Sequence, residues 1–206
     1  LSHGFISLQD YNVELTGQSG IIIYDKMRKG DATVRISLRA VILPILAGHW
    51  SFEAASDSAQ DVLIKDFMTA QLLSGDYGVD WDRFSEEALN LELAYGRMVY
   101  EKVFTVVQWN NGSYIGWKKF APRHPRSIMR WAVGQNEDEQ FGITQTLPYG
   151  GTVEIPGDKL IVLTHEREGD NWEGTSLLRS AHKHWYMKDQ LYRIDAIAHE
   201  RQGMGV

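Results

Sequence analysis

The chain offers few side chains that could do metal chemistry, although it contains seven histidines. His182 and His184 are two residues apart, so on a helix they point about 200° away from each other and cannot share one ion. His165 precedes Glu166, but no HExxH pattern surrounds this pair. We therefore predict that the histidines are structural or surface residues and that the protein binds no metal.

The sequence also lacks the common motifs for nucleotide binding and covalent catalysis. None of its nineteen glycines lies in a GxxxxGK[ST] or GxGxxG pattern, and "YGGTVEIPGD" is typical of turns. No GxSxG elbow occurs, and the absence of cysteine excludes thiolate ligands, disulfides and cysteine nucleophiles. We predict a protein with no enzyme activity and no cofactor.

Charge is distributed unevenly along the chain. The net charge of −6 argues against a general nucleic-acid coat protein. Acidic residues dominate between Ser51 and Glu101, whereas the segment from Trp117 to Trp131 has five basic residues and no acid. Such segregation is typical either of complementary faces between subunits or of adjacent faces that neutralise each other.

The pattern of apolar residues predicts an α+β fold with a helix-rich N-terminal part. Residues 1–23 have the composition of a loose arm, and a helix with Asp31 as its cap is expected to bend or restart at Pro44. The other predicted elements of this part are a short strand at 49–56, a helix within 56–73, and a helix from Phe84 to Tyr95 that stops at Gly96.

An antiparallel β region follows. Alternation begins after Gly96, and Asn111-Gly112 is a strong hairpin signal. Further short strands are predicted at 127–134, 141–148, 152–157 and 159–165. The division we predict is an N-terminal arm (1–24), an α+β domain (25–173) and a terminal helix region (174–206).

The terminal segment predicts one long helix from Leu177 to Arg201, with Thr175 or Ser176 as its cap. At 1.5 Å per residue it would be roughly 40 Å long. The helix would have three faces. One is apolar and holds Leu178, Trp185, Tyr192 and Ala196, and the neighbouring face is also apolar and holds Leu177, Ala181, Leu191 and Ala198. The third face is largely basic and polar and holds Arg179, Lys183, Tyr186, Gln190, Arg193, Ile197 and Arg201. Two apolar faces indicate neighbours on more than one side, which could be other copies of the chain. The alternative is a helix buried in its own domain, with Asp189 and Arg193 paired on a solvated face.

Four segments together resemble the portal proteins of tailed bacteriophages, most closely the Mu-like branch. They are "MRKGDATVRISLRAVILPILAGHWSFEAAS", "LELAYGRMVYEKVF", "GWKKFAPRHPRSIMRW" and "GDNWEGTSLLRSAHKHWYMKDQLYRIDAIAHERQGMGV", and they follow the order and spacing of that family. The resemblance implies a wing domain followed by a stem helix, with a clip, a second stem helix and a crown expected after Val206.

The resemblance further implies a ring of usually twelve subunits at one capsid vertex, assembled in the host cytoplasm, through which double-stranded DNA passes without sequence specificity. Its expected partners are a terminase motor, a head-completion adaptor, and capsid and scaffold proteins. We expect Arg179, Lys183, Gln190 and Arg193 to face the channel, and Leu178, Trp185, Leu191 and Tyr192 to pack against neighbouring subunits or against the wing. No membrane role is expected, since no segment approaches the length of a transmembrane helix. The rival hypothesis is a monomeric soluble hydrolase or adaptor whose long helix packs on its own sheet.

Overall fold

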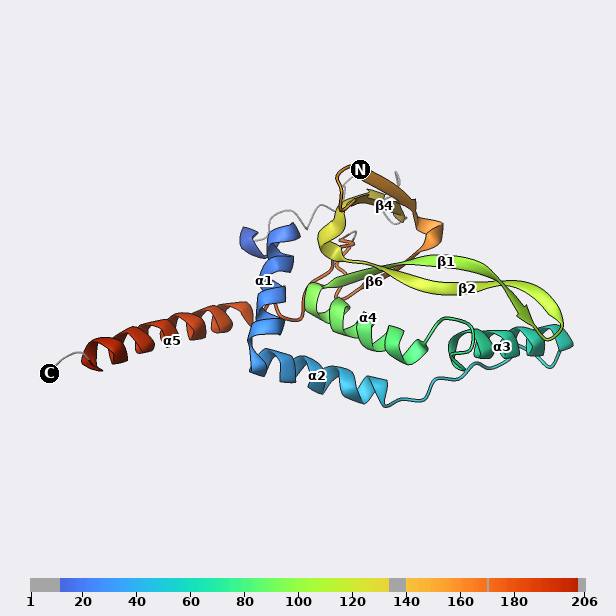
Figure 1. Ribbon diagram of the computed structural model, residues 1–206, viewed down its shortest axis with the longest axis horizontal. Helices are drawn as coiled ribbons and strands as arrows, with labels where there is room; N and C mark the ends of the chain where they lie inside the picture. The colour runs from blue at the N-terminus through green and yellow to red at the C-terminus, as the bar shows by residue number, and fades with distance from the viewer. Residues whose placement is uncertain (1–11, 134–139, 170, 204–206) are drawn as a thin grey trace.

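The computed structural model describes residues 12–133, 140–169 and 171–203. It confirms the α+β class: helices come first, two antiparallel sheets follow, and a long helix ends the described chain (Figure 1). The helices are α1 (Gly17–Gly30), α2 (Ala32–Leu46), α3 (Ala59–Leu72), α4 (Trp81–Tyr95) and α5 (His182–Gly203), with short 3-10 turns at Val13–Leu15, Pro125–Ser127 and Gly157–Lys159.

Local capping residues explain where the helices of the first half begin and end. The Asp31 carboxylate accepts hydrogen bonds from the backbone N–H groups of Thr33 and Val34, which confirms its role as the cap of α2. Gly96 ends α4 in the left-handed conformation, as the sequence predicts. The helix does not restart at Pro44: α2 continues through it and ends two residues later at Leu46.

Two other predictions for this half are wrong. Residues from Gly17 onward belong to α1, so the loose arm does not extend to residue 23; the expectation for residues 1–11 lies outside the described residues. The apolar residues Ile21, Tyr24 and Met27 fix this helix because they are buried in the core. Residues 49–54 form no strand but an extended connection between α2 and α3, where Trp50 contacts Trp81 instead of a strand partner.

The first sheet has the order β2-β1-β6, formed by β1 (Arg97–Trp109), β2 (Gly112–Arg123) and β6 (Leu160–Thr164). Asn110 and Asn111 connect β1 and β2 with positive φ angles of 47° and 61°, the backbone of a tight hairpin turn. This confirms the predicted hairpin, although the turn lies one residue before the predicted Asn111-Gly112 pair. The second sheet has the order β3-β4-β5, formed by β3 (Ile128–Val133), β4 (Gln140–Thr146) and β5 (Thr152–Pro156).

Three apolar clusters hold these layers together. The largest joins α1, α2 and the end of α4, and it includes Leu178 from the segment before α5. A second cluster lies between the two sheets, around Val99 and Ile143. The third packs α4 on the first sheet through Ala88, Met98 and Tyr100. The largest cluster therefore lies where the terminal helix leaves the domain.

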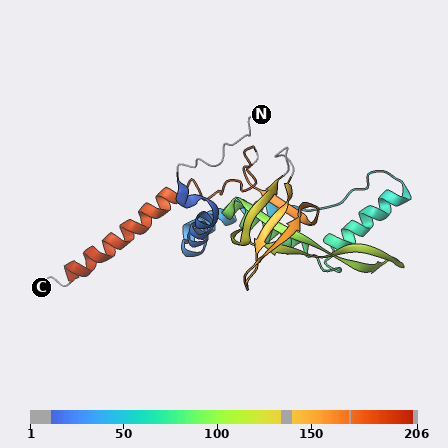
Figure 2. The same ribbon diagram turned by 90° about the horizontal axis from the view of Figure 1, so that it is seen from above.

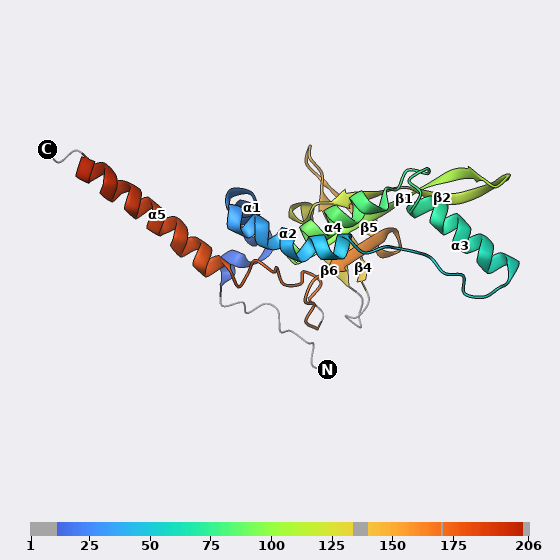
Figure 3. The ribbon, with the colours of Figure 1, turned by 90° about the horizontal axis from the view of Figure 1, so that it is seen from below.

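The terminal helix α5 projects away from the rest of the molecule in all three views (Figures 1, 2 and 3). It begins at His182 and not at Leu177, so the predicted start is wrong by more than one turn. Residues 177–181 form hydrogen-bonded turns, and the first of them is bonded to the domain, because the N–H of Leu177 donates to the Leu93 carbonyl.

Candidate functional site

The segment between β6 and α5 is bonded to the end of α4. The backbone N–H of Leu177 donates to the Leu93 carbonyl at 2.9 Å, and the Ser176 hydroxyl donates to the Ala94 carbonyl at 2.6 Å. The same Ser176 oxygen accepts from the N–H of Leu178 at 3.1 Å. Ser176 is thus the residue that orients the chain, but it lies six residues before the helix begins.

Two glycines allow the connecting segment to approach α4 this closely. Gly174 has a φ of +60°, and a Cβ atom on it would lie 2.3 Å from the Gly96 carbonyl oxygen and 2.5 Å from that of His165. Gly96, with a φ of +83°, faces the same segment from the other side. Only glycine combines this conformation with such short backbone separations.

The side chain of Arg97 binds the connecting segment from inside the domain. Only 5% of Arg97 is exposed, and its guanidinium lies 3.3 Å from a carboxylate oxygen of Glu173. Burial lowers the pKa of Arg97, and the charge of Glu173 opposes this shift. A buried arginine needs such a partner, so this ion pair holds the approach to α5 in one position.

The turns just before α5 and the first turns of the helix rest on the domain core. Leu178 is 5% exposed, and Ala181 and Trp185 pack against the cluster that contains it. Leu178 therefore has little surface left for a neighbouring subunit. One turn further along, Lys188 donates a hydrogen bond to the Asp31 carboxylate, and this bond lowers the pKa of Asp31.

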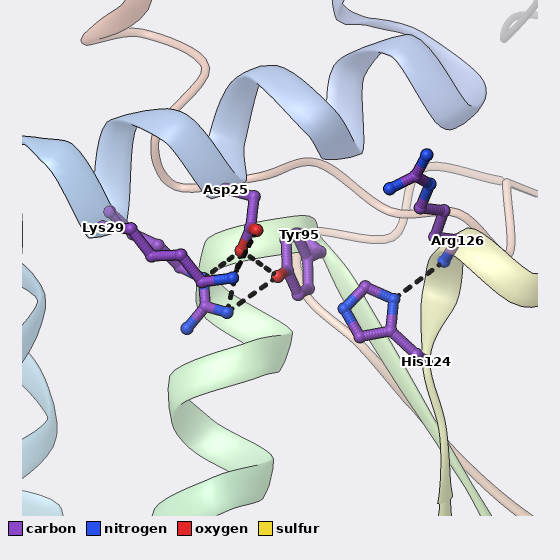
Figure 4. A network of polar contacts seen from close by, with 6 residues as sticks. Asp25, Lys29, Tyr95, His124 and Arg126 are labelled. Carbon is purple, nitrogen blue, oxygen red and sulfur yellow. Dashed lines mark hydrogen bonds and ion pairs between the residues drawn. The ribbon is translucent and has the colours of Figure 1, made fainter.

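A polar network fixes α1, from whose end Asp31 follows (Figure 4). The Tyr95 hydroxyl donates to Asp25 at 2.7 Å, and Arg28 donates both to Asp25 and to the Tyr95 oxygen at 2.9 Å. Burial disfavours the ionised form of Asp25, but hydrogen bonds from Lys29, Tyr95 and Arg28 outweigh it and lower its pKa to about 2. Burial, and then the bond to Asp25, raise the pKa of Tyr95 to about 12.

The His124 ring completes this network. It lies edge-on to the Tyr95 ring, with 5.2 Å between the ring centroids, and it accepts from the Arg126 N–H. Burial lowers the pKa of His124. The network is therefore a set of structural contacts between α1, α4 and the end of β2. These contacts fix α1 and α4, whose core packs against the base of α5.

Beyond this base, no described part of the chain covers α5. Every residue from Leu191 to Gly203 is exposed, and no α5 side chain is buried. Leu191, Tyr192 and Ile194 remain 59%, 66% and 62% exposed. Met187 and Ile194 are two exposed apolar residues that the predicted faces of the terminal helix did not include; their spacing of seven residues, with Leu191 between them, is the signal that the sequence contains.

The four residues predicted to face a channel do not form one cluster. Arg179 lies before the helix begins. Lys183 and Arg193 are exposed, and Arg193 forms an ion pair with Asp189 at 2.9 Å, as the alternative interpretation expects. Gln190 is half-buried and, with Arg193, lines a groove of about 1160 Å³ between α1 and α5.

A second groove, of about 380 Å³, lies between α2 and the base of α5 and is lined mainly by apolar residues such as Val34, Leu38 and Leu177. His182 lines the first groove and His184 the second, so these histidines point in different directions. Within the described ranges, no group of three or more His, Asp or Glu side chains is placed to hold a metal ion. No helix of the described chain is long and apolar enough to cross a membrane.

A compact domain that holds a long, uncovered helix by its first turns is typical of a structural subunit of a larger assembly. A family model described as the portal protein of Mu bacteriophage matches residues 21–206. The match covers most of the chain, so this protein belongs to the Mu-type phage portal family. That family is one of structural proteins of the phage capsid vertex, which agrees with the resemblance of the four sequence segments.

Proposed function

We propose that the protein is a subunit of a ring-shaped portal through which double-stranded DNA enters and leaves the capsid. The observation that carries this proposal is the exposure of α5. The helix projects from the domain, and its apolar side chains Leu191, Tyr192 and Ile194 are all exposed. Most of the stability of a helix in a protein comes from the packing of an apolar face. Other copies of the chain would supply that packing.

The rival hypothesis of a monomeric hydrolase or adaptor needs a different position for the helix. It expects α5 to pack on its own sheet, where its apolar faces would be covered. The structure counts against this, since α5 points away from both sheets and buries none of its side chains (Figure 2). Family membership counts against it as well.

We further propose that Arg179, Lys183, Gln190 and Arg193 face the channel of the ring. The domain is held by Trp185 and Lys188 and is too bulky to lie inside a ring of helices, so the opposite side of α5, where Lys183 lies, is the one available to the axis. Gln190 and Arg193 border that side and also line the groove towards α1, and Arg179 precedes the helix. Few and widely spaced basic groups suit a channel in which DNA must slide, because each neutralised phosphate adds salt-dependent affinity. Any such contact would be independent of DNA sequence.

The remaining features are proposals that follow from the family. They are a ring of about twelve subunits, assembly in the host cytoplasm, and contacts with a terminase motor, a head-completion adaptor, and capsid and scaffold proteins. Within the chain, residues 25–173 would form the wing and residues 174–206 the stem region. In this division the stem helix itself begins at His182.

Electron microscopy of the purified full-length protein tests the ring directly. We expect closed rings with a central hole in negative stain, and a particle mass by light scattering that is many times that of one chain. A particle that stays at the mass of a single chain at all concentrations would overturn the proposal.

A further inference from the structure

The β1–β2 hairpin continues as a two-stranded ribbon beyond the point where β6 ends. β6 pairs only with residues 97–101 of β1, whereas β2 pairs with β1 up to the turn, so residues 102–109 and 112–119 form the ribbon. Together with α3, the ribbon lies at the end of the molecule opposite the free end of α5 (Figures 1 and 3). A two-stranded hairpin alone is marginally stable in water, so the ribbon depends on what packs on its faces.

The two faces of the hairpin pack against different helices. α3 packs on one face of the ribbon, where the centroids of the Phe67 and Trp109 rings are 5.4 Å apart. Side chains of a strand alternate between its two faces, so the even-numbered residues of β1 lie on the face opposite Trp109. α4 packs on this second face at the base of the hairpin, where the centroids of the Phe84 and Tyr100 rings are 4.9 Å apart.

Three large apolar side chains are exposed on the second face of the ribbon. Val106 and Ile115 are cross-strand neighbours and are 66% and 75% exposed. Phe104, two residues before Val106 and so on the same face, is 51% exposed. We call these three residues the ribbon patch. Neighbouring apolar side chains that are exposed together are typical of interaction sites, whereas single ones are common on any surface.

The ribbon is positively charged, although the chain as a whole is acidic. Residues 102–119 include Lys102, Lys118 and Lys119 and contain no Asp or Glu. Within the described residues, none of these lysines forms an ion pair. Lys102 precedes Phe104 by two residues, so it lies on the face of the ribbon patch. The charge complementary to this surface is negative, and the part of a partner that touches the patch itself must be apolar.

We propose that the ribbon patch binds an acidic segment with apolar side chains that belongs to a different protein of the assembly. Its apolar side chains cover the patch, and its carboxylates face the lysines of the ribbon. The proposed ring is built around α5, and the patch lies at the other end of the molecule, far from the contacts that close such a ring (Figure 1). This inference rests on the proposed function and adds which surface of the domain meets a partner and the chemistry of that partner.

Charge substitutions in the patch test this in a phage whose own copy of the gene is deleted and replaced by full-length variants. Val106→Glu with Ile115→Glu should leave ring yield and thermal unfolding unchanged, because both positions are more than half exposed. The yield of DNA-filled particles should fall about tenfold, because like charges across a contact are costly. Val106→Lys with Ile115→Lys removes the same apolar side chains and should cause a smaller loss. Asn111→Asp adds an acid at the ribbon turn, outside the patch, and should give normal yields.

Revertants of the glutamate pair identify the partner. We expect second-site changes that replace an Asp or Glu of another phage protein by a neutral or basic residue. Normal particle yields for both pairs, or equal losses for both, would overturn the inference while the ring function stands. Lost ring formation by both pairs, or revertants confined to this chain, would place a second copy on the patch and overturn it as well. If the unmodified protein forms no rings, the proposed function fails and the inference with it. Ile115→Glu alone is the milder form of the test if the pair lowers thermal stability.

Discussion

Lys188 and Asp31 are 157 positions apart in the chain, and their hydrogen-bonded ion pair joins α5 to the start of α2. The Asp31 carboxylate is almost fully buried and caps α2 at the same time. From Leu191 onward every described residue of α5 is exposed. The pair is therefore positioned to determine the direction in which the helix leaves the domain.

Substitutions of Asp31 should separate its two roles. Asp31→Asn keeps a good helix cap but loses the ion pair, so we expect near-normal unfolding and a wider spread of α5 orientations. Spin labels near Gly203 and at the β1–β2 turn would measure that spread as a distance distribution. Asp31→Ala should show the same spread and also lose about 0.5–2 kcal/mol of stability with the cap. An unchanged distribution in both variants would contradict this role of the pair.

Acid should weaken the packing of α1 through Asp25. Its pKa is about 2 in the folded protein against an ordinary value of 3.8, so its contribution to stability is complete above the ordinary value and is lost as the pH falls towards 2. Urea unfolding at a series of pH values should show this loss, and Asp25→Asn should reduce the slope in that range. Tyr95→Phe removes one of the hydrogen bonds and should move the loss to higher pH. Identical profiles for all three proteins would refute the assignment.

Gly174 should not tolerate a side chain. Gly174→Ala adds the strain of a positive φ, about 1–2 kcal/mol, and also a contact of 2.3 Å with the Gly96 carbonyl. Gly169→Ala is a matched control, because Gly169 has a φ of +58° with nothing within 4 Å of the added Cβ. We expect the first variant to be clearly less stable in thermal unfolding, and equal losses would show that the close approach does not matter.

The proposed channel face should control how strongly rings hold DNA. Arg193→Gln removes a positive charge and should lower the salt dependence of DNA binding, whereas Gln190→Arg should raise it; each phosphate contact changes the slope by about one unit. His199→Gln, on another face of α5, should leave the slope unchanged. Filter binding of duplex DNA to assembled rings at several salt concentrations measures this. The face would be wrongly assigned if all three variants match the unmodified protein.

Much of the fold could be predicted from local sequence signals. Asp31, Gly96 and the turn at Asn110 and Asn111 act on the backbone of their immediate neighbours, so their effects follow from the sequence alone. The strands after Gly96 have regular alternation and are correctly predicted for the same reason. Errors at 17–23, 49–54 and 177–181 fall where partners distant in sequence override the local pattern.

The sequence by itself determined that a long helix with apolar residues on more than one face ends the described chain, because its periodicity and lack of proline are local properties. Only the tertiary structure decided where that helix begins and which of its faces is free. Leu93 and Ala94 bind the segment before His182 and prevent an earlier start, and Asp31 and the core around Leu178 occupy the side of Trp185 and Lys188. These contacts join residues from separate elements, and their energies depend on a packing that no single segment encodes. As a result, the apolar side chains of Met187, Leu191, Ile194 and Ala198 remain exposed on one face of α5.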